Sequence, residues 1–320
     1  MARAASGALR CSAVHAAGRA TVASAVEERH MARNKGRSAA RAGGMVVEEI
    51  ASWQQFQDVV AGPAYRNWAF RGHSDAEWPL YSSLSRYLKQ YGIHPQAWAH
   101  QEERIGRIFR RKAHLFLEHV PDDADAFQWL ALMQHHGAPT RLLDFTWSPF
   151  VAAFFALERA TRNAAVWAIF VPAMWRSSRT FHFPQNNETV SADKLGLRTP
   201  GAYERFYLRN TVPFVSSGEP VVMNKRLIAQ SGTFILPGVL DQPVDDVLKT
   251  YPDPSKTVAK FVLKTDLLRD EAMLALYTMN LTNATLFPDL DGLARSMAYE
   301  LEFHWAFDPK TMTTNPGYER

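Results

Sequence analysis

The sequence predicts a mixed α/β or α+β fold in which helices flank a central sheet. Segments with the β-branched and aromatic content of strands alternate along the chain with segments of helical periodicity, as is typical of such folds. The 320 residues are 47% hydrophobic, enough to bury one sizeable core, and the sequence has no internal repeat. We therefore expect a single mixed domain over residues 45–320, with its core at about 68–295, preceded by a disordered basic tail over residues 1–44.

Charge is distributed unevenly along the chain. Of the 36 Lys and Arg and 32 Asp and Glu residues, eight basic and two acidic ones lie in residues 1–44, which leaves residues 45–320 close to neutral. The tail is too poor in apolar residues to fold. The tail could also be an organelle transit peptide, or sequence translated from a start upstream of Met45. A near-neutral domain lacks the concentrated basic surface that general nucleic-acid binding requires.

Cysteine content and hydropathy narrow the class of protein further. The one cysteine, Cys11, lies in the tail, so residues 45–320 have no disulfide, no cysteine-based zinc site and no cysteine nucleophile. No apolar run approaches the roughly 18 residues that a membrane-spanning helix needs. We expect a cytoplasmic protein that does not contact a membrane.

The first expected elements are a helix, a strand and a second helix. Ser52 is a candidate N-cap for a helix over residues 53–60, which Gly62-Pro63 ends. The strand at 68–72 finishes in Gly72, where the backbone must turn or let another group approach closely. An amphipathic helix follows over residues 96–119, and its basic face is either a solvated surface or a contact for a polyanion.

Helices and strands continue to alternate through the rest of the domain. Ser148 and Pro149 have the residue types of an N-cap and a first helical position, and they introduce a helix over 150–158 that is apolar on nearly every side and must be central. The other expected elements are helices at 127–135, 266–279 and 289–297, the last capped by Asp289, and strands at 165–171, 232–236, 257–264 and 301–305.

Polar residues concentrate in four segments with apolar surroundings. In the first, over residues 70–73 and 78–86, Arg71 stands at the end of a buried strand beside a glycine. Its planar guanidinium can bind a phosphate or carboxylate there, or pair with an internal acid such as Asp144. The second segment, 134–146, places Arg141 and Asp144 where a strand meets the central helix, and the partner of each charge is either structural or a ligand.

The third and fourth segments are residues 224–234 and 286–293. Arg226 and Gln230 are four residues apart and share a helical face, while Gly232 lets the chain turn into a strand.

In the second segment, the adjacent His135 and His136 point in different directions on regular backbone. Because no acidic companion stands at ligand spacing, we expect no metal site.

In this order, the segments resemble the FRG-domain family of bacteria, whose Phe-Arg-Gly motif stands here as Phe70-Arg71-Gly72. The resemblance continues through Trp78-Pro79-Leu80, Ser83-Leu84-Ser85-Arg86, the block 134–145, Ser148-Pro149, the run 230–234 and the run 286–292. The sequence departs from the family at Phe145, where tryptophan is usual, and at Ala138, where leucine or isoleucine is frequent. Neither departure changes a polar residue of the motifs.

The order of motifs is also similar to that of the ADP-ribosyltransferase superfamily, which implies an NAD-binding enzyme and a role as a toxin or phage-defence effector. This similarity places Arg71 beside the NAD ribose or phosphate, Thr146 with Ser148 before the helix under the nicotinamide, and Gln230 at the third position. Glu300 or Glu302 could supply a carboxylate instead. The further residues that we expect at the ligand are His73, Ser83, Arg86, Gln134, His135, Thr140, Arg141, Asp144 and Arg226.

The chemistry expected of such an enzyme is the departure of nicotinamide, which leaves an oxocarbenium-like centre. Catalysis would then consist mainly of positioning the dinucleotide and stabilising the developing charge. A neutral Gln230 would orient a nucleophile but make a poor general base. The acceptor of the ADP-ribose would be a nucleic acid or a protein.

The alternative function is a binding module that recognises a phosphate-bearing ligand or nucleic acid through Arg71, Arg86, Arg141 and Arg226 without performing chemistry. A nuclease or metal-dependent hydrolase has the least support, because no carboxylate–histidine cluster has ligand spacing. The sequence lacks Gly-x-Gly-x-x-Gly, P-loop and Gly-x-Ser-x-Gly motifs, so dehydrogenase, kinase and serine-hydrolase functions lose their usual support.

Overall fold

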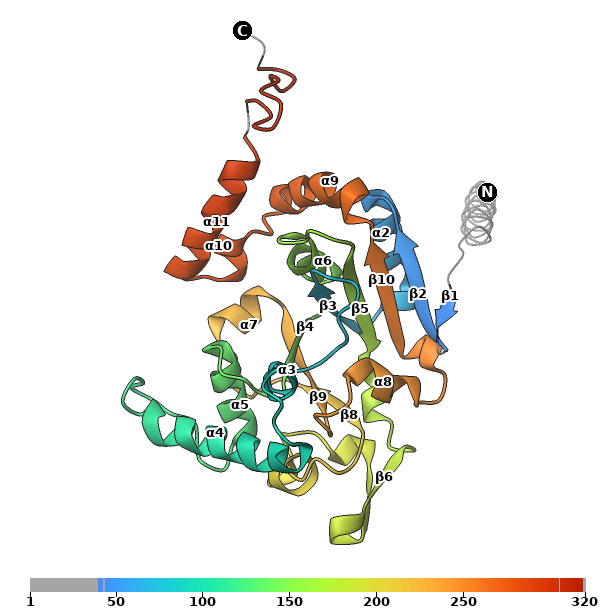
Figure 1. The fold of residues 1–320 in the computed structure, drawn as a ribbon, viewed down its shortest axis with the longest axis vertical. Coiled ribbons are helices and arrows are strands. Elements are labelled where there is room, and N and C mark those ends of the chain that lie inside the picture. Colours follow the sequence, from blue (N-terminus) through green and yellow to red (C-terminus); the bar gives the residue numbers. More distant parts are fainter. Residues whose placement is uncertain (1–39, 43, 305, 319–320) are drawn as a thin grey trace, which may run out of the picture. The chain divides into compact units, whose positions relative to one another are not determined.

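A computed structural model describes residues 40–42, 44–304 and 306–318, and residues 41–320 form one compact unit (Figure 1). The predicted tail therefore lies almost entirely outside the described residues. The strands are β1 (Ala40–Ala42), β2 (Met45–Ile50), β3 (Trp68–His73), β4 (Leu143–Thr146), β5 (Ala164–Phe170), β6 (Thr180–Phe183), β7 (Glu188–Ser191), β8 (Val215–Gly218), β9 (Gly232–Pro237) and β10 (Val258–Leu263).

The helices lie between these strands and after the last of them. They are α2 (Trp53–Val60), α3 (Ser83–Gln90), α4 (Trp98–Ala113), α5 (Ala126–His135), α6 (Pro149–Leu157), α7 (Lys225–Ala229), α8 (Val244–Lys249), α9 (Thr265–Thr278), α10 (Asn283–Leu286) and α11 (Leu290–Glu302). In the part of the chain that the structure describes, no helix is long and apolar enough to cross a bilayer.

One mixed sheet organises the fold. Its strand order is β1-β2-β10-β5-β3-β4-β9-β8, and β6 and β7 form a separate hairpin. β2 and β10 run parallel, and the pairings from β10 to β8 are antiparallel. β10, orange in Figure 1, thus lies between β2 and β5, two strands that come much earlier in the chain.

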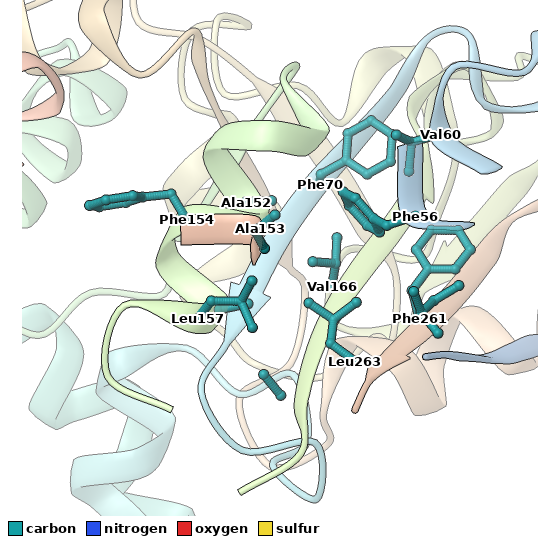
Figure 2. Close-up of a cluster of buried hydrophobic side chains, with 14 of the residues drawn as sticks. Phe56, Val60, Phe70, Ala152, Ala153, Phe154, Leu157, Val166, Phe261 and Leu263 are labelled. Carbon is teal, nitrogen blue, oxygen red and sulfur yellow. The ribbon is translucent and has the colours of Figure 1, made fainter. Parts of the chain in front are cut away.

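Helices α2, α6 and α9 cover one face of this sheet. Their apolar residues pack with inward-facing residues of β3, β5 and β10, among them Phe70, Val166 and Phe261 (Figure 2). The opposite face, which includes Ala69 and Trp167, packs on α8 and the turn over residues 171–175. Burial on both faces explains the apolar strands, and the predicted class of a mixed domain with a helix-flanked sheet is confirmed.

Gly72 brings β3 into close contact with α6. A Cβ atom at this position would lie 2.1 Å from the main-chain oxygen of Ala152 and 2.5 Å from the nitrogen of Ala156. Of the two reasons that the sequence offered for a glycine here, close approach is the one observed, and the approaching group is the backbone of the central helix. Ser148 begins that helix as predicted, because its side chain accepts a hydrogen bond from the Val151 N–H.

Three expectations about local structure were wrong. Leu301 and Glu302 belong to α11 instead of a late strand, because the helix that Asp289 caps continues through them, and Trp305 lies outside the described residues. The helix expected over 96–119 ends at Ala113, and a tight turn leaves Phe116 83% exposed. The turn into β9 occurs at Ser231, with φ +46°, before Gly232.

Candidate functional site

The central sheet opens between β3 and β4. These neighbouring strands pair only at Phe70 and Thr146, whereas β3 pairs with β5, and β4 with β9, along their whole lengths. If the register continued, Gly72 would stand opposite Asp144. Instead, the Arg71 side chain occupies the gap, and its Nη1 donates to the main-chain oxygen of Asp144 at 2.6 Å. Arg71 was predicted at the end of its strand, but it lies within β3, which continues to His73, and its guanidinium occupies an opening of the sheet.

A pocket of about 220 Å³ lies at this opening. Its lining consists of Phe70, Arg71, Gly72, Asp144, Phe145, Thr146, Ala152, Phe155, Arg226 and Gln230. The lining thus combines two arginines and one aspartate with the partly buried Phe155. The volume is below the roughly 300–1,000 Å³ of pockets that enclose a drug-sized ligand. It can therefore hold one ring or one phosphate group of a larger ligand.

His73 orients Arg71 within the pocket. Arg71 Nε donates to His73 Nε2 at 3.2 Å, and His73 Nδ1 lies 3.3 Å from the main-chain oxygen of Trp78. Both contacts are satisfied when the imidazole is neutral with its proton on Nδ1, a tautomer that we assign from this network. Burial, with a smaller effect of the Arg71 charge, lowers the pKa of His73 to about 3.

Asp144 is held by a chain of hydrogen bonds from behind the pocket. Its Oδ2 accepts from Gln134 Nε2 at 2.7 Å, and Gln134 Oε1 accepts from the Thr140 hydroxyl at 2.7 Å. Ser83 in turn exchanges hydrogen bonds with the main chain of Thr140. Gln134, Thr140 and Ser83, which we expected at the ligand, are therefore connected to the pocket but do not line it.

Arg226 and Gln230 come from the other side of the opening, where Arg226 lies in the first turn of α7 and Gln230 is its C-cap. The Arg226 guanidinium lies 4.7 Å from the centre of the Phe287 ring, a cation–π contact that fixes its place. Gln230 Nε2 donates to the main-chain oxygen of Leu286 at 3.0 Å. The Thr146 hydroxyl donates to the main-chain oxygen of Gln230 at 2.7 Å. The structure thus brings Arg71, Thr146 and Gln230 together at one pocket.

Two other expected residues lie near the pocket's charges. Burial lowers the pKa of Arg86, and the charge of the nearby Asp144 carboxylate raises it in part. Arg86 therefore adds positive charge beside Asp144. Burial, followed by the charges of His136 and Arg226, lowers the pKa of His135. His135 Nδ1 is buried without a hydrogen-bond partner among the described residues. The charge around Asp144 is thus predominantly positive.

Arg141 and Ser148 have internal roles. The Arg141 side chain is 0% exposed, donates to both carboxylate oxygens of Glu102, and donates to the main-chain oxygens of Pro237 and Tyr207. It has no surface to offer a ligand. The Ser148 hydroxyl accepts from the first turn of α6 and serves as the helix cap. Of the alternatives that the sequence left open for Arg141, the geometry favours the internal ion pair.

The carboxylates considered as substitutes for Gln230 are not in the pocket lining. Glu302 binds the Arg269 guanidinium through both oxygens, and Glu300 lies exposed on α11. The acid at the pocket is Asp144. In the part of the chain that the structure describes, no three His, Cys, Asp or Glu side chains are grouped so as to hold a metal ion.

Several pocket residues were not identified from the sequence. Phe155 and Ala152 belong to the apolar helix α6, and nothing in its pattern separates the positions that face the pocket from those in the core. Phe287, which positions Arg226, stood in a recognised segment but had no assigned role. The signal available in the sequence was its place directly before Pro288 in a polar segment. In the structure, Phe287 is partly exposed.

Comparison with known proteins identifies a family for part of the chain. Residues 66–165 match the family model of the FRG domain. This range contains Arg71, His73, Asp144 and Thr146 and ends before Arg226 and Gln230. No curated protein and no solved structure matches the chain. Residues 66–165 are therefore an FRG domain, as the motifs indicated, and they include the Phe-Arg-Gly strand and the strand beside it at the pocket.

Proposed function

We propose that the pocket between β3 and β4 binds NAD as a substrate and that the chain is an ADP-ribosyltransferase-like enzyme. The observation that supports this most directly is the opening of the sheet, which sets Arg71 and Arg226 around a small space beside the carboxylate of Asp144. Arginine forks suit the pyrophosphate of a dinucleotide. A space of about 220 Å³ beside the partly buried Phe155 suits a single nicotinamide ring.

In the proposed reaction, the bond between C1′ of the ribose and the nicotinamide nitrogen breaks, and nicotinamide leaves with the electron pair. The positive charge that develops at C1′ is stabilised by Asp144, whose carboxylate the Gln134 amide holds in place. A nucleophile of the acceptor then bonds to C1′ and loses its proton. Thr146 acts as a positioning residue, because its hydroxyl joins β4 to the end of α7.

A binding module without chemistry is the second candidate. It is favoured by the hydrogen bonds of Thr146, Ser148 and Gln230, all of which engage the chain itself. In this form the same two arginines bind the phosphate groups of a nucleotide, and Asp144 orients Arg71 without stabilising a transition state.

The test is incubation of the full chain with NAD and a mixture of cellular RNA, DNA and protein. Nicotinamide release is followed by chromatography, ADP-ribose transfer by mass spectrometry, and NAD binding by the shift of the thermal midpoint. Asp144→Asn should abolish release and retain binding, while Arg71→Lys should weaken both. Arg159→Ala, at an arginine side chain that is 74% exposed, is the matched control and should behave as wild type.

The outcomes separate the two candidates. A thermal shift without release from the wild-type chain would support the binding module. The absence of both release and shift would exclude NAD as the ligand of this pocket.

A further inference from the structure

Helix α11 exposes its apolar face. Leu290, Leu293, Met297 and Leu301 follow one another at spacings of three and four residues and are 78%, 50%, 50% and 82% exposed. With Ala294 and Ala298, also exposed, they form a continuous stripe, which we call the α11 stripe. The side of the helix that packs on the chain carries Gly292 and Tyr299, the latter stacked on Tyr277. This arrangement is the reverse of a core-facing amphipathic helix.

An apolar groove lies between α4 and α5. Its volume is about 570 Å³, and its lining includes Ile105, Ile108, Phe109, Phe116 and Met133. Phe116 at one end is 83% exposed. We call this feature the α4–α5 groove. A concave apolar surface between two helices is the shape that receives an amphipathic helix with anchors at positions i, i+3 and i+7.

The two surfaces have opposite charges at their edges. Arg104 and Arg111 stand four residues before and three residues after Ile108, so they share its side of α4, and Lys112 lines the groove itself. Glu300 stands three residues after Met297 at one edge of the α11 stripe, and Asp291 lies at the other edge. A basic rim thus matches an acidic-edged helix.

We propose that the α11 stripe of one copy of this chain docks into the α4–α5 groove of a second copy. Each chain has one stripe and one groove, so two chains related by a two-fold axis exchange their helices and cover both surfaces. The two helices have similar lengths, 13 residues in α11 and 16 in α4. The sequence left a solvated face and a polyanion contact as alternatives for the basic residues on α4. In the proposed dimer these residues lie against acidic residues of the second copy.

The mass of the full chain in solution tests this proposal, measured by light scattering on size-exclusion fractions. The wild type should have twice the 36.1 kDa of one chain. Met297→Glu in the stripe and Ile108→Glu in the groove should each give the mass of one chain, because a charge would have to be buried in the contact. Leu274→Glu, at a leucine of α9 that is 52% exposed, is the matched control and should leave the mass doubled.

Mixing and charge exchange identify which surfaces meet. A mixture of the Met297→Glu and Ile108→Glu chains should recover a two-chain species, since one intact stripe then meets one intact groove. This recovery also shows that both variants fold. Glu300→Arg and Arg111→Glu should each weaken association a few-fold, and the double variant should restore it.

Two results would overturn the proposal. One is a wild-type chain with the mass of a single chain at every concentration. The other is an association that Met297→Glu abolishes while Ile108→Glu and Arg111→Glu leave it unchanged, which would mean that the stripe packs on another stripe.

Discussion

At the scale of single residues, Arg71 and His73 work as a pair. His73 accepts from Arg71 through one nitrogen and contacts the Trp78 carbonyl through the other. Only the neutral ring fits both contacts, because a proton on Nε2 would face the guanidinium. Burial and the Arg71 charge accordingly lower the pKa of His73 to about 3 from its ordinary 6.5. The histidine that we expected at the ligand therefore supports the arginine from behind.

This pair predicts a pH dependence of stability. Between pH 6.5 and about 3, His73 is protonated in the unfolded chain but neutral in the folded chain. The free energy of unfolding is therefore unaffected by this residue above pH 6.5 and decreases as the pH falls below it. The loss approaches about 1.4 kcal/mol per pH unit. His73→Gln should flatten the dependence of the unfolding free energy on pH, measured by urea denaturation between pH 7.5 and 5. The exposed His182→Gln is the control, and equal slopes in wild type and His73→Gln would contradict the assignment.

At the scale of elements, Gly72 sets the distance between β3 and α6. A Cβ atom there would collide with the main chain at Ala152 and Ala156, which no side-chain rotation relieves. Gly72→Ala should therefore destabilise the fold by about 3 kcal/mol, the upper end of ordinary overpacking. Gly106→Ala on α4 is the opposite case, because nothing lies within 4 Å of its Cβ, and it should stabilise by about 0.5–1 kcal/mol. Thermal and urea unfolding of both variants check this contrast.

The junction of α7 and β9 stores backbone strain. Ser231 has φ +46°, and its main-chain oxygen accepts from the Trp147 N–H, which ties the junction to β4. The left-handed conformation costs a residue with a Cβ about 1–2 kcal/mol, and glycine avoids this cost but loses more entropy on folding. Ser231→Gly should raise the unfolding free energy by about 0.5–1 kcal/mol, while Ser231→Ala, which keeps the Cβ, should leave it nearly unchanged. Destabilisation of the alanine variant as well as the glycine variant would show that the serine hydroxyl has a role instead.

At the scale of the whole molecule, local sequence signals predicted many of the helices and strands. Contacts between residues far apart in the sequence could not be predicted in the same way. Ser148 and Asp289 were predicted as caps because capping depends on residues within one turn. The alternation of apolar and polar residues at 301–305 indicated a strand, because five residues are too few to show a helical period. In the structure, the helix that Asp289 caps continues to Glu302. Spacing also could not choose between Asp144 and Glu102 as partners for arginines, because Glu102 lies 39 residues before Arg141.

The Arg141–Glu102 pair joins four distant parts of the chain: α4, the segment before β4, the end of β9 and the turn at Tyr207. Arg141→Met should destabilise the fold by about 3–5 kcal/mol, because it leaves a buried carboxylate unpaired. Glu102→Leu should cost a similar amount, and the double variant should recover most of the loss, although the main-chain oxygens of Pro237, Gly238 and Tyr207 still lack their donor. Urea unfolding of the four chains measures this coupling. If Arg141→Met kept the wild-type stability but lost the thermal shift with NAD, Arg141 would instead be a ligand-binding residue.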